Sequence, residues 1–189
     1  MLKKTLATVL ALALLLPAVA LGDASALPFG LKMGMTTDET LAAFKADATL
    51  SATKPNKEDY DNGAVEFTFD SIAIPGTDIT ADSFSAQVDE NNSAKTAKLT
   101  TLSFVVSPTD SSIAEFRTLL AAITKAYGAP ESDPFSADAV DTYVEWGTLD
   151  ATWAMPDARV SLSLSRMYEE SITLQYTSRL NYDKADLAE

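Results

Sequence analysis

The stretch between Pro108 and Pro130 limits the fold more than any other part of the chain, because its apolar residues follow the period of an α-helix. They recur mostly at spacings of three and four, which places them on one side of a helix: Ile113, Phe116, Leu119, Leu120, Ile123 and Tyr127. A helix with one apolar side needs another layer of structure to cover that side. The strand patterns on both sides of this stretch predict a sheet that supplies the second layer.

Both ends of this helix are marked in the sequence. Ser112 and Glu115 fit a capping box at its start, and Thr109 or Asp110 is an alternative cap. Gly128 suits the left-handed residue that ends many helices. The pattern therefore predicts a helix of about four turns that ends before Gly128.

The N-terminus has the three parts of a secretory signal peptide. Lys3 and Lys4 form a basic start, an apolar run follows over residues 6–16, and two small-residue patterns end at Ala20 and Ala26. We expect cleavage after Ala26 and a mature protein in the periplasm or outside the cell. An uncleaved membrane anchor is the alternative, but the apolar run is shorter than the about 20 residues that span a bilayer.

The residue types that are absent exclude several kinds of chemistry. The 189 residues include no Cys and no His. Disulfides, thiolate or imidazole metal sites and His-dependent nucleophilic catalysis are therefore excluded. The seven Gly residues do not form a phosphate-binding loop. We predict no metal and no cofactor.

The charge of the chain is strongly acidic. Removal of the signal peptide takes away Lys3, Lys4 and Asp23, so the 14 basic and 27 acidic residues become 12 and 26, a net charge of −14. Such a surface repels nucleic acid and anionic lipid, so we expect neither as a partner. No later apolar stretch is long enough to cross a bilayer, so the mature form should have no integral membrane span.

Alternating apolar residues predict the strands of the first half. Residues 27–33 form a predicted strand, and Thr36 with Glu39 starts a helix that runs to about Asp47. Residues 49–63 are polar and rich in turn formers, so we expect a loop that ends in an Asn-Gly turn. An antiparallel meander follows, with strands at 65–74 (bulged or bent near Asp70), 84–88 and 102–106.

The second half repeats this order. After a predicted loop over residues 131–139, Val144, Trp146 and Trp153 flank a turn at 147–150 and predict a hairpin. Both Trp side chains fall on the same side as Val144, so we expect them to face the long helix. A second hairpin is predicted from residues 160–164 and 172–176.

These elements predict one α+β domain over residues 27–177, after a signal peptide at 1–26 and before a polar tail at 178–189. The expected architecture is a two-layer sandwich, in which two helices pack on one face of a mainly antiparallel sheet. The order of strand, helix, three strands, helix and four strands is compatible with two helix-plus-meander halves.

Part of the sequence resembles a group of exported proteins. Residues 31–36 with Glu39 and Leu41 form an LKMGMT strand-to-helix start, and residues 127–130 form a YGAP helix exit. This pattern resembles small exported bacterial proteins, including the outer-membrane-assembly lipoproteins of the BamE/SmpA type and the two-repeat β-lactamase inhibitor proteins. The resemblance implies the fold and export. It assigns no functional residue, and the Cys residues of both groups are absent here.

Aromatic and arginine side chains in the last third of the chain are the candidate contacts for a ligand or partner. Tyr143 and Tyr168 can contact a sugar or peptide, whereas we expect the two Trp residues in the core. Arg159, Arg166 and Arg179 can clamp an anion or a carboxylate. Ion pairs at strand ends are the alternative role for these three.

Polar residues alternate along 161–165 and 173–177 and form either a solvated face or an adaptable contact surface. We therefore expect an exported, non-enzymatic binding or protein-interaction domain, with an envelope or extracellular protein or a glycan as its partner. The alternative is a carboxylate-dependent glycan hydrolase, which needs two carboxyl groups across a cleft. Its candidate carboxyls, at hairpin ends, are Glu145, Asp150, Glu169 and Glu170.

The cleavage prediction can be tested directly. Mass spectrometry of the exported protein should give Leu27 as the first residue, because the small-residue pattern ends at Ala26. Recovery of a chain that still begins at Met1 from the membrane fraction would instead favour the anchor.

Overall fold

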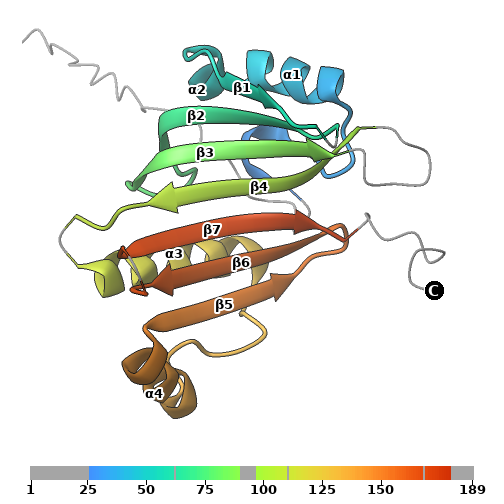
Figure 1. Ribbon diagram of the computed structural model, residues 1–189. Coiled ribbons are helices and arrows are strands. Elements are labelled where there is room, and N and C mark those ends of the chain that lie inside the picture. The colour runs from blue at the N-terminus through green and yellow to red at the C-terminus, as the bar shows by residue number, and fades with distance from the viewer. Residues whose placement is uncertain (1–25, 62, 90–96, 110, 168, 180–189) are drawn as a thin grey trace, which may run out of the picture.

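The computed structural model describes residues 26–61, 63–89, 97–109, 111–167 and 169–179 (Figure 1). The helices in this part of the chain are η1 (Pro28–Gly30), α1 (Thr37–Ala46), α2 (Ala48–Ser51), α3 (Ser112–Tyr127) and α4 (Ala137–Trp146). The strands are β1 (Asn56–Asp59), β2 (Val65–Ala73), β3 (Thr80–Asp89), β4 (Lys98–Val106), β5 (Thr148–Ala154), β6 (Ala158–Ser165) and β7 (Ser171–Ser178). None of the described helices has the length and apolar character that a membrane crossing requires.

Within the described residues the strands form one seven-stranded antiparallel sheet, in the order β1-β2-β3-β4-β7-β6-β5. Each half of the chain contributes a meander, β2-β3-β4 or β5-β6-β7, and α1 or α3 precedes it. The two meanders join where β4 pairs with β7. The predicted α+β class and the mainly antiparallel sheet are confirmed.

Phenylalanine rings fill the core over the first meander. Phe69, Phe84 and Phe104 come from three neighbouring strands, and each is at most 1 % exposed. The ring centroids of Phe84 and Phe104 are 4.7 Å apart, and Phe44 of α1 meets the Phe69 ring edge-on at 5.0 Å. Offset and edge-on ring pairs are favourable beyond the area they bury, so these contacts hold α1 against the strands.

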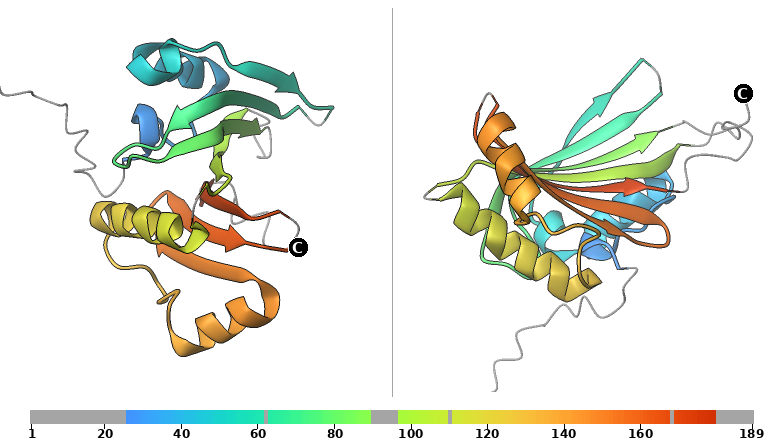
Figure 2. Two further views of the ribbon diagram at one scale, coloured as in Figure 1. Left: turned by 90° about the vertical axis from the view of Figure 1, so that its left-hand side faces the viewer. Right: turned by 90° about the horizontal axis from the view of Figure 1, so that it is seen from below.

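Aliphatic side chains, together with Phe116, Trp153 and Tyr176, fill the core over the second meander, where α3 contacts β6 and β7 (Figure 2). The predicted apolar side of α3 faces this core. Phe116, Leu119 and Ile123 are buried in the middle of that side. The flanking members, which are Ile113, Leu120 and Tyr127, are partly buried.

The cap of α3 differs from the predicted one by one residue. Ser111 is the N-cap, and its Oγ accepts a hydrogen bond from the Ala114 N–H at 3.4 Å. Glu115 does not close a capping box. Its Oε1 accepts from the Thr109 backbone N–H at 3.1 Å and from the Thr109 hydroxyl at 3.0 Å. The predicted end is confirmed, since Gly128 follows the helix with a φ of 88°.

The capping box predicted at the start of α1 is present. The Glu39 N–H donates to Thr36 Oγ1 at 3.3 Å, and the Thr36 N–H donates to Glu39 Oε2 at 2.8 Å. These bonds from Thr36 hold the pKa of Glu39 below its ordinary value of 4.5. The box therefore stabilises α1 at neutral pH, and that contribution is lost as the pH falls through the lowered pKa.

The prediction of a strand at residues 27–33 is wrong. This segment begins with η1, in which Phe29 has a φ of 60°, and Leu31 N–H donates back to Pro28 O at 3.2 Å. Pro28 has no N–H to donate to a strand ladder. The alternation of apolar residues is still meaningful, because Leu27, Leu31 and Met33 are all buried.

The predicted loop at 49–63 contains two short elements. Asp47 caps α2, because its Oδ1 accepts from the N–H groups of Thr49 and Leu50 at 2.8 and 3.0 Å. The strand β1 pairs with β2 although all four of its side chains are exposed, so no apolar pattern marked it. Gly63 in the turn between them has a φ of 82°, as an Asn-Gly turn requires, while Asn62 lies outside the described residues.

The hairpin predicted around residues 147–150 is also wrong. Residues 137–146 form α4, which Ser136 caps by accepting from the Ala139 N–H at 3.3 Å, and Gly147 ends it with a φ of 74°. Trp146 is consequently 62 % exposed rather than buried. The prediction for Trp153 is confirmed: it is 2 % exposed, and its indole N–H donates to Gly128 O at 2.9 Å.

The irregularity predicted near Asp70 is a bend. Ser71 has a φ of 56°, while the pairing of β2 with β3 continues on both sides without an extra residue. The other predicted strands and the hairpin of β6 and β7 are confirmed. Ser178 is buried at the end of β7, so the sheet extends one residue into the predicted tail. The remainder of that tail from residue 180, and residues 1–25 with the predicted signal peptide, lie outside the described residues.

The packing of α3 predicts different costs for two adjacent leucines. Leu119→Ala should lower the free energy of unfolding by about 2–5 kcal/mol, the usual effect of a cavity in a core. Leu120→Ala serves as the matched control and should cost less, because Leu120 is only partly buried. Urea denaturation of both variants checks this, and equal losses would contradict the orientation of α3.

Candidate functional site

One face of the sheet carries polar side chains in rows that cross the strands. The central row consists of Thr68, Ser85, Ser103, Gln175, Ser161 and Thr152, each paired with the next. The row on one side is Asp70, Ser83, Val105, Thr173, Ser163 and Asp150, and the row on the other side is Glu66, Gln87, Thr101, Thr177, Arg159 and Ala154. We call these three rows the polar sheet face.

The polar sheet face is open and nearly uncharged at its centre. Figure 1 looks onto it, with α3 behind the strands. All 18 positions are at least partly exposed, and 12 of them are Ser, Thr or Gln. The four charged residues lie on the strands toward its margins, and these are Glu66, Asp70, Asp150 and Arg159. The face can therefore offer many hydroxyl and amide hydrogen bonds around a neutral centre.

Two of the three candidate arginines lie together at one margin of the polar sheet face. Arg159 and Arg179 line an open depression of about 710 Å³ with Glu131 and Gln175. The Arg159 guanidinium is 3.5 Å from the Glu131 carboxylate, and Arg179 Nη1 donates to Met155 O at 3.3 Å. Both guanidinium groups have protein partners, but only that of Arg159 is an ion pair, because Arg179 contacts a backbone carbonyl.

The third arginine stands apart from this depression. The Arg166 guanidinium carbon lies 4.2 Å from the centre of the Tyr143 ring. The backbone N–H of Arg166 donates to Gly147 O at 2.8 Å. Two predicted contact residues thus hold α4 against the β6–β7 hairpin, and a clamp of all three arginines is not formed. Tyr168, the remaining candidate, lies outside the described residues.

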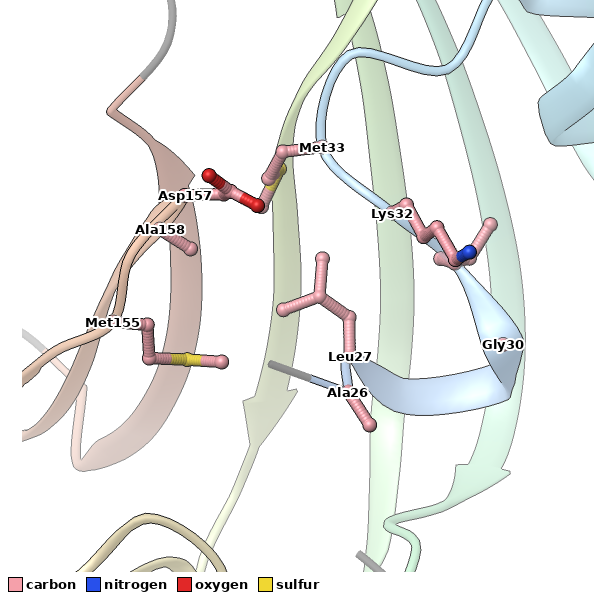
Figure 3. A pocket seen from close by; sticks show the side chains of 9 residues that line it. Ala26, Leu27, Gly30, Lys32, Met33, Met155, Asp157 and Ala158 are labelled. Atoms are coloured by element: carbon pink, nitrogen blue, oxygen red, sulfur yellow. The ribbon is translucent and has the colours of Figure 1, made fainter. Parts of the chain in front are cut away.

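A second cavity, of about 390 Å³, lies where the N-terminal segment meets β6. Figure 3 shows Leu27 in its centre, Met155 and Ala158 on one side, and Lys32 directed away from Asp157. The Tyr127 hydroxyl donates to the Ala26 carbonyl at 2.9 Å nearby, a contact that the predicted cleavage would remove, while Leu27, Leu31 and Met33 are buried beside it. These contacts dock the segment onto the domain, so the cavity is a packing feature rather than a polar site.

Glu131 is the margin residue that the sequence did not indicate. The sequence predicts a loop here, but the Glu131 N–H donates to Thr152 O at 2.7 Å and its Oε2 accepts from the Thr152 hydroxyl at 2.9 Å. No motif marks such a long-range pairing.

Among the described residues, no group of three or more His, Cys, Asp and Glu side chains is placed to hold a metal ion. Searches of protein-family models, curated proteins and solved structures find no match to this chain. The resemblance to exported proteins of the BamE/SmpA type accordingly remains a prediction from sequence.

The stacking of Arg166 on Tyr143 predicts a structural role. Arg166→Ala should lower the free energy of unfolding by about 0.5–1 kcal/mol, the usual value of an exposed cation–π contact. Amide hydrogen exchange should become faster in α4 and stay unchanged in α3. Arg159→Ala is the control, since its exposed ion pair contributes little. Unchanged exchange in α4 of the Arg166 variant would contradict this role.

Proposed function

We propose that this chain is an exported domain that binds another protein through the polar sheet face, while α1 and α3 together form the helical layer over the opposite face. The observation that supports the proposal is the open polar sheet face itself. Six strands present it in register, and no described helix lies over its centre in Figure 1.

The composition of the face suits contact with a protein. Serine and threonine lose little side-chain entropy when a partner immobilises them, and together with Gln they donate and accept hydrogen bonds in several directions. Adaptable polar contacts of this kind are common in paratopes. The described side chains of this face include no aromatic ring, so it lacks the stacking platform that would favour a glycan.

The size of the face indicates how a partner would sit. Six strands at about 4.8 Å spacing span roughly 24 Å, and five residues along a strand span about 17 Å. The flat footprint is therefore about 400 Å², roughly half of the ~800 Å² that each partner buries in a standard interface. A stable partner must also contact the margins, including the depression with Arg159 and Arg179.

Exposure of the candidate carboxyls argues against the glycan hydrolase. A general acid needs an environment that raises its pKa, which is usually an apolar or enclosed site. Glu145, Asp150 and Glu169 are exposed, and Glu170 accepts a hydrogen bond from the Ser112 hydroxyl at 2.6 Å. The proposal of export rests on the signal-peptide pattern, and the acidic charge fits a partner other than nucleic acid.

Capture from a cell-envelope extract tests the binding function. Ser103→Tyr with Ser161→Tyr places two bulky, uncharged side chains in the central row, and Tyr is well tolerated in strands. Immobilised wild-type protein should retain a partner that this double variant retains at least about tenfold less, as expected when the middle of an interface is blocked. Quantitative mass spectrometry of the retained proteins measures the difference.

The matched control is Ala121→Tyr, at an exposed position of α3 on the other side of the sheet (Figure 1), which should retain the partner as the wild type does. Identical retained proteins for the double variant and the wild type would contradict binding through this face. In parallel, envelope glycans should not be hydrolysed. A hydrolysis that one Glu or Asp substitution abolishes would favour the hydrolase instead.

A further inference from the structure

Four of the five large apolar side chains that are strongly exposed in the described residues lie at one corner of the molecule. Val140, Val144 and Trp146 belong to α4, and Met167 lies in the turn between β6 and β7. Their exposed fractions are 40, 74, 62 and 61 %. We call these four residues the corner patch.

Backbone contacts bring the two parts of the corner patch together. The Arg166 N–H donates to the carbonyl of Gly147 at 2.8 Å. Gly147 directly follows Trp146, and Met167 directly follows Arg166, so both exposed side chains adjoin this hydrogen bond. The stacking of Arg166 on Tyr143 at 4.2 Å holds the helix in that position. The patch is therefore built on a supported helix and not on a loose end.

The apolar side of helix α4 is only partly covered, and the rest of it faces solvent. Tyr143 packs against the core cluster. Val140 and Val144 are four residues apart and share one side of the helix, which the sheet does not cover. The two views of Figure 2 place α4 beside β5 and on the other side of the sheet from α3.

Acidic side chains border the corner patch. Asp141 and Glu145 are exposed and lie 100° around the helix from the two valines. Glu169 is exposed in the same turn as Met167, whereas the neighbouring Glu170 is directed to Ser112 of α3. Arg166 is the basic residue of this corner, and it is stacked on Tyr143. An apolar surface with an acidic border matches an apolar surface with a basic border.

We propose that the corner patch docks a basic amphipathic segment of another protein, a helix with apolar residues on one side and Lys or Arg beside them. Exposed Trp side chains are typical anchors of such contacts, and the apolar residues at α4 spacing suit a helix against a helix. A second copy of this chain is disfavoured, because the two acidic borders would face each other. An anionic membrane is disfavoured for the same reason.

The experiment uses a defined probe. A fluorescein-labelled peptide of about 18 leucine and lysine residues, patterned as an amphipathic helix of five turns, is titrated with the protein and followed by anisotropy. A second peptide carries Glu in place of every Lys. The wild-type protein should bind the Lys peptide and not the Glu peptide.

Substitutions then locate the binding site. Val144→Ser with Trp146→Ser should weaken binding of the Lys peptide at least about tenfold, as loss of an interface anchor does. Tyr60→Ser removes the exposed aromatic side chain that lies outside the corner patch, and it should leave binding unchanged. The Ser103→Tyr and Ser161→Tyr variant should also bind normally, so this test is independent of the polar sheet face.

Thermal unfolding serves as the folding control, because Val144 and Trp146 are exposed and their loss should leave the melting temperature unchanged. The double substitution Asp141→Lys with Glu145→Lys should weaken binding of the Lys peptide and allow the Glu peptide to bind. Wild-type affinity in the Val144 and Trp146 variant, or an equal loss in Tyr60→Ser, would overturn the proposal. So would sedimentation of the wild type as a dimer that this variant dissociates, because the occupant would then be a second copy.

Discussion

The pairing of β4 with β7 is the contact on which the whole architecture depends. This pairing joins two meanders that have few other contacts with each other. Its register places Leu102 opposite Tyr176 and Phe104 opposite Leu174. On the buried side these pairs join the phenylalanine core of the first meander to the core of the second, which combines aliphatic side chains with Phe116, Trp153 and Tyr176. On the open side the same register sets Ser103 beside Gln175, so the central row is continuous across the two halves. A shift by one residue would exchange the two faces and expose the core.

The two proposed contact regions follow from what the core does not use. The helix α3 packs on one face of the sheet at β6 and β7, and an antiparallel sheet can leave its other face to water or to a partner. Here that face is rich in hydroxyl groups and its central row is uncharged, while the exposed apolar surface lies on α4 at the edge. The two regions differ in chemistry, so they can be blocked separately. One is a broad polar surface of short side chains, and the other is a small apolar anchor with an acidic border.

Long periodic patterns in the sequence predicted the fold well, and short ones misled. The six apolar residues of α3 fit one side of a helix and no other regular structure. The alternation in β3, β4, β6 and β7 likewise fits only a strand with one buried side, so these elements are confirmed. Val144 and Trp146 are two residues apart and mimic a strand, but Ser136 as a cap and Gly147 as a helix end were the stronger signals. For the candidate site, the polar alternation in β6 and β7 was visible. The extension of that face over β2 to β5, and the separation of Arg166 from the other arginines, depend on strand order, which no local pattern contains.

Both outer strands of the sheet are protected, each in a different way. β1 has the sequence Asn-Lys-Glu-Asp with all four side chains in solvent, and the Glu131 backbone occupies part of the outer side of β5 through Thr152. Unprotected outer strands recruit further strands and lead to fibrous aggregates. These two features therefore disfavour growth of the sheet by strand addition. Even at high concentration, the protein should associate through side chains, which can discriminate among partners. Backbone pairing, which cannot discriminate, is disfavoured.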